Sequence, residues 1–569
     1  MLSGRSTVLC SERTGRGPDV TGYIDDLSAE YFTAYLDASP TEAHVLGQYD
    51  WAGRFEVLTR EEEDRQIAEL RGFVAAAEAI IESDLDDQQR ITRDVLVNDA
   101  TTRADVLEAR LRTFSADPVF GPQVQLPVIV GMLMMPTPEV ADAMVAKYDG
   151  IGRSYLELAD RQREGLAAGR VSPAFAVAGT IAQIDEALAV PADQDPLLGT
   201  TPLPDGVDAE AWRARMIDVI ERSIRPGMAV YRDVLRDEVL PRARPDDRAG
   251  LCWLEDGAET YARTLRYFTT TTKSAEEIHE IGLQQVAQLA EEYRQLGPEV
   301  VGTDDLQRIF EAMRSDPKLH FENGDQLVEA AEVAMRRAWD ALPAWFELVP
   351  QAPCSVQATT TGPKAYYFPP AADGSRGGSF YINVADPESW GTFELESMAF
   401  HEGIPGHHLQ LAIASELQDV PEFRKHIHNS AYAEGWGLYT ERLADEMGLY
   451  GGALDRMGIF SADSMRACRL VVDTGLHALG WSRQQAVDYL VANSPLTEGV
   501  CRPEVDRYIL YPGQATSYMI GRLEILRMRA EAQQRQGDGF DIRRFHTAVL
   551  DNGSLPLGVL DEVVRARLP

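Results

Sequence analysis

Apolar residues recur three and four positions apart along almost the whole chain, from about residue 26 to the C-terminus. Clear examples are residues 61–81, 93–114 and 140–164. This spacing puts the apolar side chains on one face of a helix, as in amphipathic helices that pack against a core. Helix start signals agree, because Thr137 precedes Pro138, and Ser274 and Glu277 have the spacing of a capping box. The sequence therefore predicts a mainly α-helical protein.

One segment interrupts this helical pattern. Residues 355–385 contain three short runs rich in β-branched and aromatic residues, separated by Gly, Pro and Asp. The runs are Ser355–Thr360, Ala365–Phe368 and Ser379–Val384. Runs of this kind favour short strands joined by turns. We expect one small antiparallel β-sheet here, directly before the helical pattern resumes at Glu394.

The length of 569 residues permits either several domains or one large helical body. Residues 1–19 are rich in Ser, Gly and Arg, and we expect a flexible tail there. The Pro- and Gly-rich segment 191–208 is the clearest linker. It separates an N-terminal helical region, residues 20–190, from a C-terminal helical region, residues 209–569, which contains the predicted sheet.

Acidic residues strongly outnumber basic ones, since 90 Asp and Glu stand against 54 Lys and Arg, and the formal net charge is −36. Such a surface repels nucleic-acid phosphates and anionic lipids, so we expect no nucleic-acid partner and no membrane partner. The five cysteines include no CxxC pair, which argues against a disulfide framework and a cysteine zinc knuckle. We find neither a signal-peptide pattern nor an apolar run of 18 residues, and we predict a cytoplasmic protein.

Six of the ten histidines lie between residues 401 and 477. The central string, HEGIPGHHLQ, begins at His401, and the string AEGWGLYTE begins at Ala433. Imidazole and carboxylate ligands suit a zinc-like divalent ion. In the helical zinc motif HExxH, two histidines lie one turn apart and the adjacent Glu takes a proton from water. Pro405 occupies the position of the second histidine, so the standard motif is absent.

A variant of this motif remains open. Along a straight helix His401 and His408 lie about 10.5 Å apart, too far for one ion, so the helix must be broken between them. The two glycines and the proline of the string permit such a break. His407 is the alternative second ligand. We favour His408 as the ligand and expect His407 to contact the ligands rather than the ion.

The third ligand is expected from the second string. Glu434 lies on the next predicted helix, and three protein ligands leave a fourth position open for water. Glu402, beside the first ligand, is the expected general base. Glu441 follows Glu434 by seven residues, and it either orients a ligand histidine or is a solvated helix charge. We expect the two other histidines nearby, His426 and His428, at the surface.

The strings HEGIPGHHLQ and EGWGLYTE resemble the bacterial family called domain of unknown function 885. Further stretches that look like blocks of this family are residues 267–282, 377–387, 469–481 and 507–521. The resemblance covers most of residues 25–555. The family is similar to the gluzincins, the zinc peptidases that include thimet oligopeptidase. The resemblance implies one Zn²⁺ ion held by His401, by His407 or His408, and by Glu434, with Glu402 as general base and general acid.

Gluzincins also supply a Tyr or His from a later helix that donates to the oxyanion. By this resemblance the candidates are Tyr508, Tyr511, Tyr518 and His477. We favour Tyr511 first and Tyr518 second, because Tyr511 directly precedes a Pro-Gly break from which its ring can project. The alternative for each ring is packing in the core with its polar atom bonded.

The resemblance further implies a substrate site. In gluzincins a strand before the metal helix pairs with the substrate backbone, which would be residues 379–384 here; the alternative is plain sheet structure. The candidate substrate-binding residues are Gly378, Phe380, Tyr381, Arg507 and Gln514. Arg469 and Arg522 share with Arg507 the capacity to pair with a carboxylate, and salt bridges to acidic residues are the alternative.

Three functions are consistent with the sequence, and the oligomeric state stays open. The leading hypothesis is a zinc-dependent metallopeptidase that hydrolyses short peptides in a deep cleft between two helical halves, as in thimet-type folds. The second is a metal-dependent hydrolase of a non-peptide amide metabolite. The third is a non-catalytic scaffold derived from a peptidase, which Pro405 supports and the intact Glu402 opposes.

Overall fold

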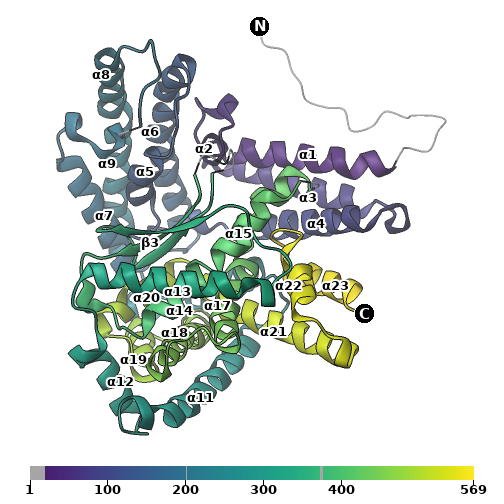
Figure 1. Cartoon of the computed structure of the whole chain (residues 1–569). Coiled ribbons are helices and arrows are strands. Elements are labelled where there is room, and N and C mark those ends of the chain that lie inside the picture. The colour runs from purple at the N-terminus through teal and green to yellow at the C-terminus, as the bar shows by residue number, and fades with distance from the viewer. Residues whose placement is uncertain (1–19, 200, 372–373, 375, 419) are drawn as a thin grey trace.

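The computed structural model describes residues 20–569 except 200, 372, 373, 375 and 419, so the predicted tail, residues 1–19, lies outside the described residues. Helices dominate the described chain, and three short strands form one sheet, which confirms the predicted mainly α-helical fold. The helices gather in groups around this sheet (Figure 1).

The N-terminal helices pack onto elements from the other end of the chain. They are α1 (Val20–Ala38), α2 (Pro40–Val45), α3 (Arg60–Glu78) and α4 (Asp87–Glu108). Tyr31 of α1 meets the ring of Phe423, with centroids 5.5 Å apart. Both side chains belong to one large apolar core that also contains Leu560 near the C-terminus. This long-range packing closes the structure around the predicted metal region.

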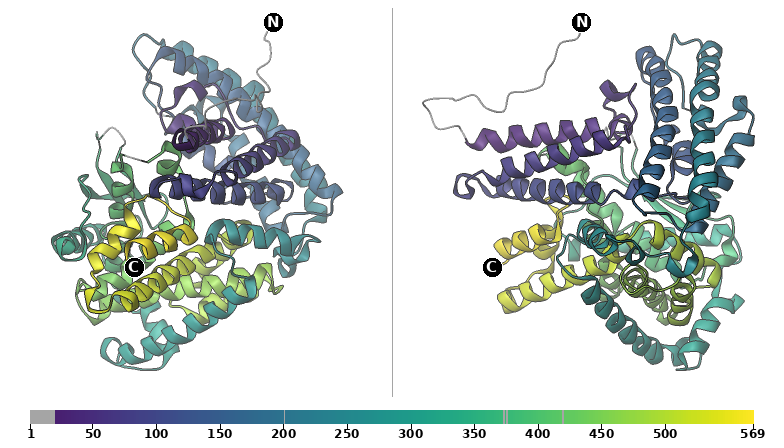
Figure 2. Two further views of the ribbon diagram at one scale, coloured as in Figure 1. Left: turned by 90° about the vertical axis from the view of Figure 1, so that its right-hand side faces the viewer. Right: turned by 180° about the vertical axis from the view of Figure 1, so that it is seen from behind.

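A second group of helices forms an upright bundle with its own core (Figures 1 and 2). Its helices are α5 (Pro122–Val130), α6 (Pro138–Ala167), α7 (Ala174–Ala189), α8 (Ala209–Val219) and α9 (Arg225–Val234). In the predicted linker, residues 191–208, Leu197 and Leu198 are buried in the same core as Trp212. The segment therefore connects helices of one packed unit, and the division into two halves at this point stays a prediction.

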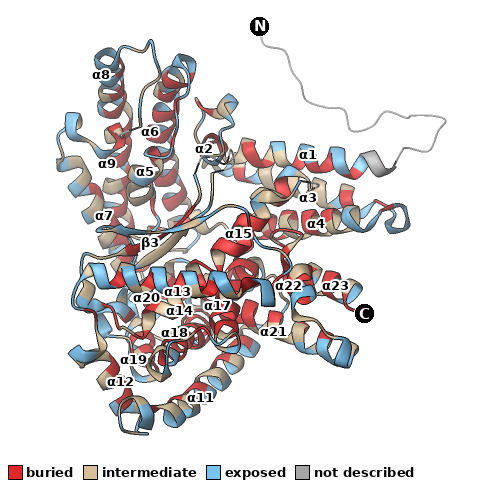
Figure 3. Cartoon of the chain, in the orientation of Figure 1, coloured by how far each residue is buried: buried red, intermediate tan, exposed pale blue. Residues whose placement is uncertain are grey.

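The remaining helices form the main body. They are α10 (Gly257–Thr269), α11 (Ala275–Val300), α12 (Leu306–Ser315), α13 (Gly324–Trp345), α14 (Glu394–Glu402), α15 (His407–Glu416), α16 (Glu422–His426), α17 (Ser430–Glu446), α18 (Ala453–His477), α19 (Arg483–Asn493), α20 (Glu498–Leu510), α21 (Ser517–Gln536), α22 (Ile542–Leu550) and α23 (Leu557–Arg567). Buried residues are dense on α15, α17 and α18, at the centre of the body (Figure 3). The predicted capping box at Ser274 and the cap at Thr137 both form.

The small sheet differs from the prediction in its topology. Its strands are β1 (Cys354–Thr359), β2 (Ala365–Phe368) and β3 (Gly378–Asn383), in the order β1-β3-β2. β1 pairs parallel with β3, and β2 pairs antiparallel with β3, so the sheet is mixed where we expected an antiparallel one. The reason is that the third strand inserts between the first two, an arrangement that local strand signals do not define. The strand positions themselves agree with the prediction to within one residue.

Every helix within the described ranges is too short or too polar to span a membrane.

The helix that begins the HEGIPGHHLQ string breaks where the sequence predicts. α14 ends at Glu402 and α15 begins at His407, and the Ile404–Pro405 peptide in the turn between them is cis. The indole Nε1 of Trp436 on α17 donates to the carbonyl of Pro405 at 3.0 Å. A Cβ atom on Gly406 would lie 1.9 Å from the carbonyl oxygen of His401, so this close backbone approach requires glycine.

We predict that Gly406→Ala destabilises the fold by at least about 3 kcal/mol, because its methyl group would overlap backbone that no side-chain rotation can move. Gly72→Ala in α3 is the matched control, since a Cβ there meets open space, and it should stabilise the protein by about 0.5–1 kcal/mol. Urea unfolding followed by circular dichroism measures both. Equal stability of Gly406→Ala and the parent protein would contradict the proposed close approach.

Candidate metal centre

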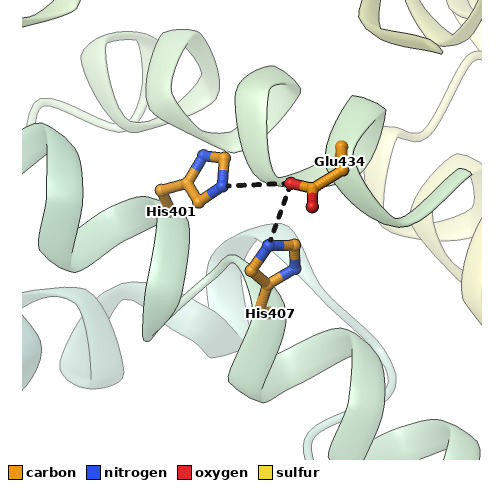
Figure 4. Close-up of side chains that lie close together, drawn as sticks. All are labelled: His401, His407 and Glu434. Atoms are coloured by element: carbon orange, nitrogen blue, oxygen red, sulfur yellow. Dashed lines mark ion pairs between the residues drawn. The ribbon is translucent and has the colours of Figure 1, made fainter. Parts of the chain in front are cut away.

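Three side chains from three helices meet behind the helix break (Figure 4). His401 lies at the end of α14, His407 at the start of α15, and Glu434 on α17. Glu434 Oε2 is 3.6 Å from His401 Nε2 and 3.5 Å from His407 Nε2. All three ligand atoms lie within 4.8 Å of one another. This is the group that could hold a metal ion among the residues the structure describes.

The two separations from Glu434 fit one tetrahedral ion of zinc size. Ligand bonds of about 2.0–2.2 Å place neighbouring tetrahedral ligands about 3.3–3.6 Å apart. Two imidazoles and one carboxylate also form the donor set of catalytic zinc sites, which keep a position open. Burial opposes ionisation of Glu434, but His401 and His407 hold the pKa of its carboxyl well below the usual range. The carboxylate is therefore charged and ready to bind a cation.

His401 is held in the orientation that a metal ligand needs. Its Nδ1 lies 2.8 Å from Glu441 Oε1, and the other Glu441 oxygen accepts from Ser397 Oγ at 2.8 Å. When Nδ1–H donates to Glu441, the Nε2 lone pair faces Glu434 and His407. A Cβ on Gly437 would lie 2.7 Å from the His401 ring, so this glycine makes room for it. Glu441 is thus buried beside His401, which excludes the solvated-charge alternative.

Burial opposes protonation of His401, yet the carboxylates of Glu434 and Glu441 raise its pKa to about 9. When no metal ion is bound, the His401 imidazole thus lies between two carboxylates. The same negative charge attracts a cation, which replaces the proton when a metal binds.

The structure corrects our preference for His408 over His407. His408 Nδ1 lies 2.8 Å from the Tyr367 hydroxyl, and His408 Nε2 lies 3.0 Å from the carbonyl of Ala352. Both ring nitrogens are therefore occupied by groups at the sheet, and burial lowers the pKa of His408 to about 4. His407 has the opposite surroundings, since its Nε2 faces Glu434 and its buried Nδ1 has no hydrogen-bond partner within the described chain.

Glu402 lies beside the centre and is partly exposed. Its negative charge acts on His401, which precedes it directly. No hydrogen bond or salt bridge from the described residues holds its carboxylate, unlike Glu434 and Glu441. A free carboxylate next to a metal group has the character of a general base.

His428 is a residue whose relation to the site we missed. We expected it at the surface, and it is indeed exposed, but it borders the metal group. The charges of Glu434 and His407 both act on the imidazole of His428. The sequence offered only its position two residues before the start of α17. His426 is half-buried and stacks on Phe32 at 5.4 Å.

The two tyrosines that we favour as oxyanion donors differ in their surroundings. Tyr518 on α21 is partly exposed, and its pKa is raised first by burial and then by the charge of Glu434, so it borders the centre. Tyr511 is 39% exposed, and its ring contacts Phe120 and Phe268 at 5.3 and 4.9 Å. Which of the two donates to the oxyanion stays a prediction.

His477 is placed in the core, contrary to its proposed role. Its Nδ1 accepts from the backbone N–H of Leu251 at 3.1 Å, and its Nε2 lies 3.0 Å from the carbonyl of Tyr508. Full burial lowers its pKa to about 4. Both ring nitrogens are used, so His477 has no donor to offer a substrate.

The predicted substrate strand lacks a free edge. β3 is the central strand, and β1 and β2 occupy its two sides over residues 379–382. Phe380 is fully buried in the core, and Tyr381 stacks on Tyr366 with centroids 4.9 Å apart. A Cβ on Gly378 would lie 2.5 Å from His408 Nδ1, so this glycine serves packing. Pairing of a substrate with β3 is excluded by this topology.

Arg507 and Gln514 remain near Tyr518. Arg507 Nη1 donates to Gln514 Oε1 at 2.7 Å, and the charge of Arg507 acts on Tyr518. Arg522, in contrast, is buried and paired with Asp463. Arg522 therefore stabilises the fold and is not available to pair with a substrate carboxylate.

The predicted deep cleft between the halves stays a prediction. A groove of about 620 Å³ does open where the segment before α5 faces α20. Its lining residues are Pro118, Val119, Glu498, Gly499, Arg502, Pro503 and Asp506. The metal group lies outside this lining.

Comparison with known proteins places the chain in a family. The profile of the family described as "Bacterial protein of unknown function (DUF885)" matches residues 40–564. None of the curated proteins compared with the chain matches it significantly.

Two solved structures share the fold over nearly their whole length. One is a candidate lipoprotein from Colwellia psychrerythraea, with a TM-score of 0.87 and 23% identity, over 96% of this chain and 99% of that chain. The other is a candidate lipoprotein of unknown function from Shewanella oneidensis, with a TM-score of 0.76 and 19% identity, over 95% of this chain and 99% of that chain. At these identities the likeness establishes the fold alone.

We predict that His407→Ala abolishes tight zinc binding, whereas His408→Ala keeps one zinc ion per chain. The reason is that, of these two residues, His407 directs a ring nitrogen toward Glu434, whereas both ring nitrogens of His408 are bonded elsewhere. Equilibrium dialysis with elemental analysis measures the stoichiometry, and circular dichroism checks that both variants fold. The opposite pattern, with zinc lost from His408→Ala alone, would refute this ligand set.

Proposed function

We propose that this chain, which belongs to the DUF885 family of bacterial proteins of unknown function, is a zinc-dependent metallopeptidase that hydrolyses short peptides. One observation carries the proposal: two imidazoles and one carboxylate converge, and Glu402, which directly follows the ligand His401 in the chain, acts on it through its charge while no described residue holds its carboxylate. A closed structural zinc site would need four protein ligands and no base. A three-ligand group with an adjacent base instead fits water activation.

The residues have separate tasks in this mechanism. A bound zinc ion would polarise the attacking water and the carbonyl of the scissile amide. Glu402 accepts a proton from the water as it attacks, and it later returns this proton to the leaving amine nitrogen. The scissile C–N bond breaks, and the products are a carboxylic acid and an amine, so atoms and protons balance.

Tyr518 is the group that we assign to the oxyanion. Its phenol borders Glu434, and burial raises its pKa, so the hydroxyl stays protonated and can donate. Glu441 acts through His401, because it fixes the tautomer and the ring orientation of this ligand. His428, which also borders Glu434 and His407, is a candidate for contact with the substrate.

The location of the protein is a separate proposal. We predict the cytoplasm from the sequence, whereas the likeness to two candidate lipoproteins favours the cell envelope. Fractionation of the source bacterium, followed by immunoblotting, distinguishes the two locations. Recovery in the envelope fraction would refute the cytoplasmic assignment.

We predict that Glu402→Gln lowers kcat for peptide hydrolysis by about 10²–10⁴-fold while one zinc ion stays bound, because an amide cannot take the proton from water. Glu388→Gln is the control, since this residue is exposed in the turn before α14. Release of new amino groups from a peptide panel measures the rate. Full activity of zinc-loaded Glu402→Gln, or cleavage of metabolite amides without any cleavage of peptides, would contradict the proposal.

A further inference from the structure

A cluster of charged and aromatic side chains lies next to the metal centre, and only its member Tyr518 has a task in the proposed chemistry. We call it the arginine cluster. It consists of Arg469 on α18, Glu504, Arg507 and Tyr508 on α20, Gln514 in the short turn before α21, and Tyr518 at the start of α21. Its members all lie within residues 469–518.

The arginine cluster carries more positive than negative charge. A single oxygen, Oε2 of Glu504, accepts from Arg469 Nη2 at 3.0 Å, from Arg507 Nη2 at 2.9 Å and from the Tyr508 hydroxyl at 2.7 Å. Burial opposes ionisation of Glu504, yet the two guanidinium groups lower its pKa to about 2. One carboxylate thus serves two arginines, and a unit of positive charge is left over.

Asp473, a buried acid on which the charge of Arg507 acts, does not supply the missing charge. Asp473 on α18 feels the charge of Arg507, but its oxygens accept from the Tyr261 hydroxyl and from the backbone N–H of Gly513. Burial also raises the pKa of Asp473 to about 7, so much of it is neutral near neutral pH. The excess positive charge therefore remains within the arginine cluster.

Guanidinium donors are left unused in this cluster. Arg469 is 6% exposed, and its buried Nη1 has no hydrogen-bond partner within the part of the chain that the structure describes. A buried donor without a partner costs free energy unless a ligand supplies one. Arg507 has five N–H donors, and its hydrogen bonds to Glu504 and Gln514 use two of them. Its side chain is 16% exposed, so a ligand can reach it.

Tyr518 connects this cluster to the metal centre. The Arg469 guanidinium lies 4.5 Å from the centroid of the Tyr518 ring, and the Tyr518 phenol feels the charge of Glu434. The helices that carry Glu434 and Tyr518 cross at two glycines, because a Cβ on Gly435 would lie 2.5 Å from the backbone of Gly521. Tyr518 thus contacts Arg469 and lies within the influence of the charge of Glu434.

We propose that the arginine cluster binds the C-terminal carboxylate of the peptide substrate, with Arg507 as the accessible contact and Arg469 as the buried charge behind it. This inference rests on the proposed peptidase function and names its substrate class. A carboxylate supplies the missing negative charge and matches the planar fork of a guanidinium. The enzyme then acts near the free C-terminal end of short peptides, since the carboxylate is held beside Tyr518 and the metal centre.

The test compares one peptide with and without its terminal charge. Ala-Ala-Ala and its C-terminal amide are given to the zinc-loaded parent protein, and kcat/KM is measured for each. We expect the acid to be favoured by about 10- to 100-fold, as for a charge-assisted bidentate contact. Equal kcat/KM values for acid and amide would overturn the proposal without affecting the peptidase function.

Arg507→Met assigns the preference to this cluster. It should reduce the acid-to-amide ratio to below about threefold, mainly through a higher KM for the acid. Arg502→Met is the matched control on the same helix, because Arg502 pairs with Glu498 at the surface. Thermal unfolding checks the fold of both variants. An unchanged ratio in folded Arg507→Met would refute the role of Arg507.

Binding separates this proposal from the proposed function. Calorimetry with zinc-loaded Glu402→Gln measures the affinity for the same acid and amide without turnover. If no peptide is hydrolysed by the parent protein but the acid binds at least tenfold more tightly, the carboxylate site stands and the peptidase function fails. If both peptides bind equally, the carboxylate site fails whatever the activity.

Discussion

The metal group depends on the close approach of Gly406 to the backbone carbonyl of His401. On an unbroken helix, residues 401 and 407 would lie about 9 Å apart along the axis, beyond the reach of one ion. The turn between α14 and α15 folds the chain back, so that the two imidazoles come within 3.6 and 3.5 Å of the same Glu434 oxygen. Trp436 holds this turn from α17, the helix that also carries Glu434. One tertiary contact therefore fixes the break and the third ligand together.

His401 and His408, on opposite sides of the break, differ in what surrounds them, and this difference decides their roles. His401 has a buried anionic partner, Glu441, which is itself held by Ser397. His408 is bound to Tyr367 and Ala352, so it ties α15 to the sheet region. The sheet thereby positions α15 and, through it, His407. A strand segment that we expected to bind substrate instead supports a ligand from behind.

The sequence was sufficient for the features that local patterns encode. Helical periodicity predicted the fold, and the glycines and proline of residues 403–406 predicted the break. It was not sufficient to choose between His407 and His408, because adjacent helical residues point about 100° apart and only the turn geometry sets which one faces Glu434. The strand order was equally inaccessible, since the insertion of β3 between β1 and β2 is a non-local event. His477 and His401 are both buried, and only their partners distinguish a core histidine from a ligand.

The whole molecule is negatively charged, whereas the arginine cluster is positively charged. An anionic group is therefore repelled by the molecule at long range and attracted by the cluster at short range. A net charge of −36 repels a carboxylate at long range, although salt screens this repulsion beyond about 8 Å. Attraction must then arise at short range, where Arg469 is buried and water competes least. Such a site selects a carboxylate that is carried in by the rest of a peptide, because a free anion gains no other contacts to offset the repulsion. At the metal centre the local charge and the net charge have the same sign, because the carboxylates of the centre and the net negative charge of the molecule both attract a cation.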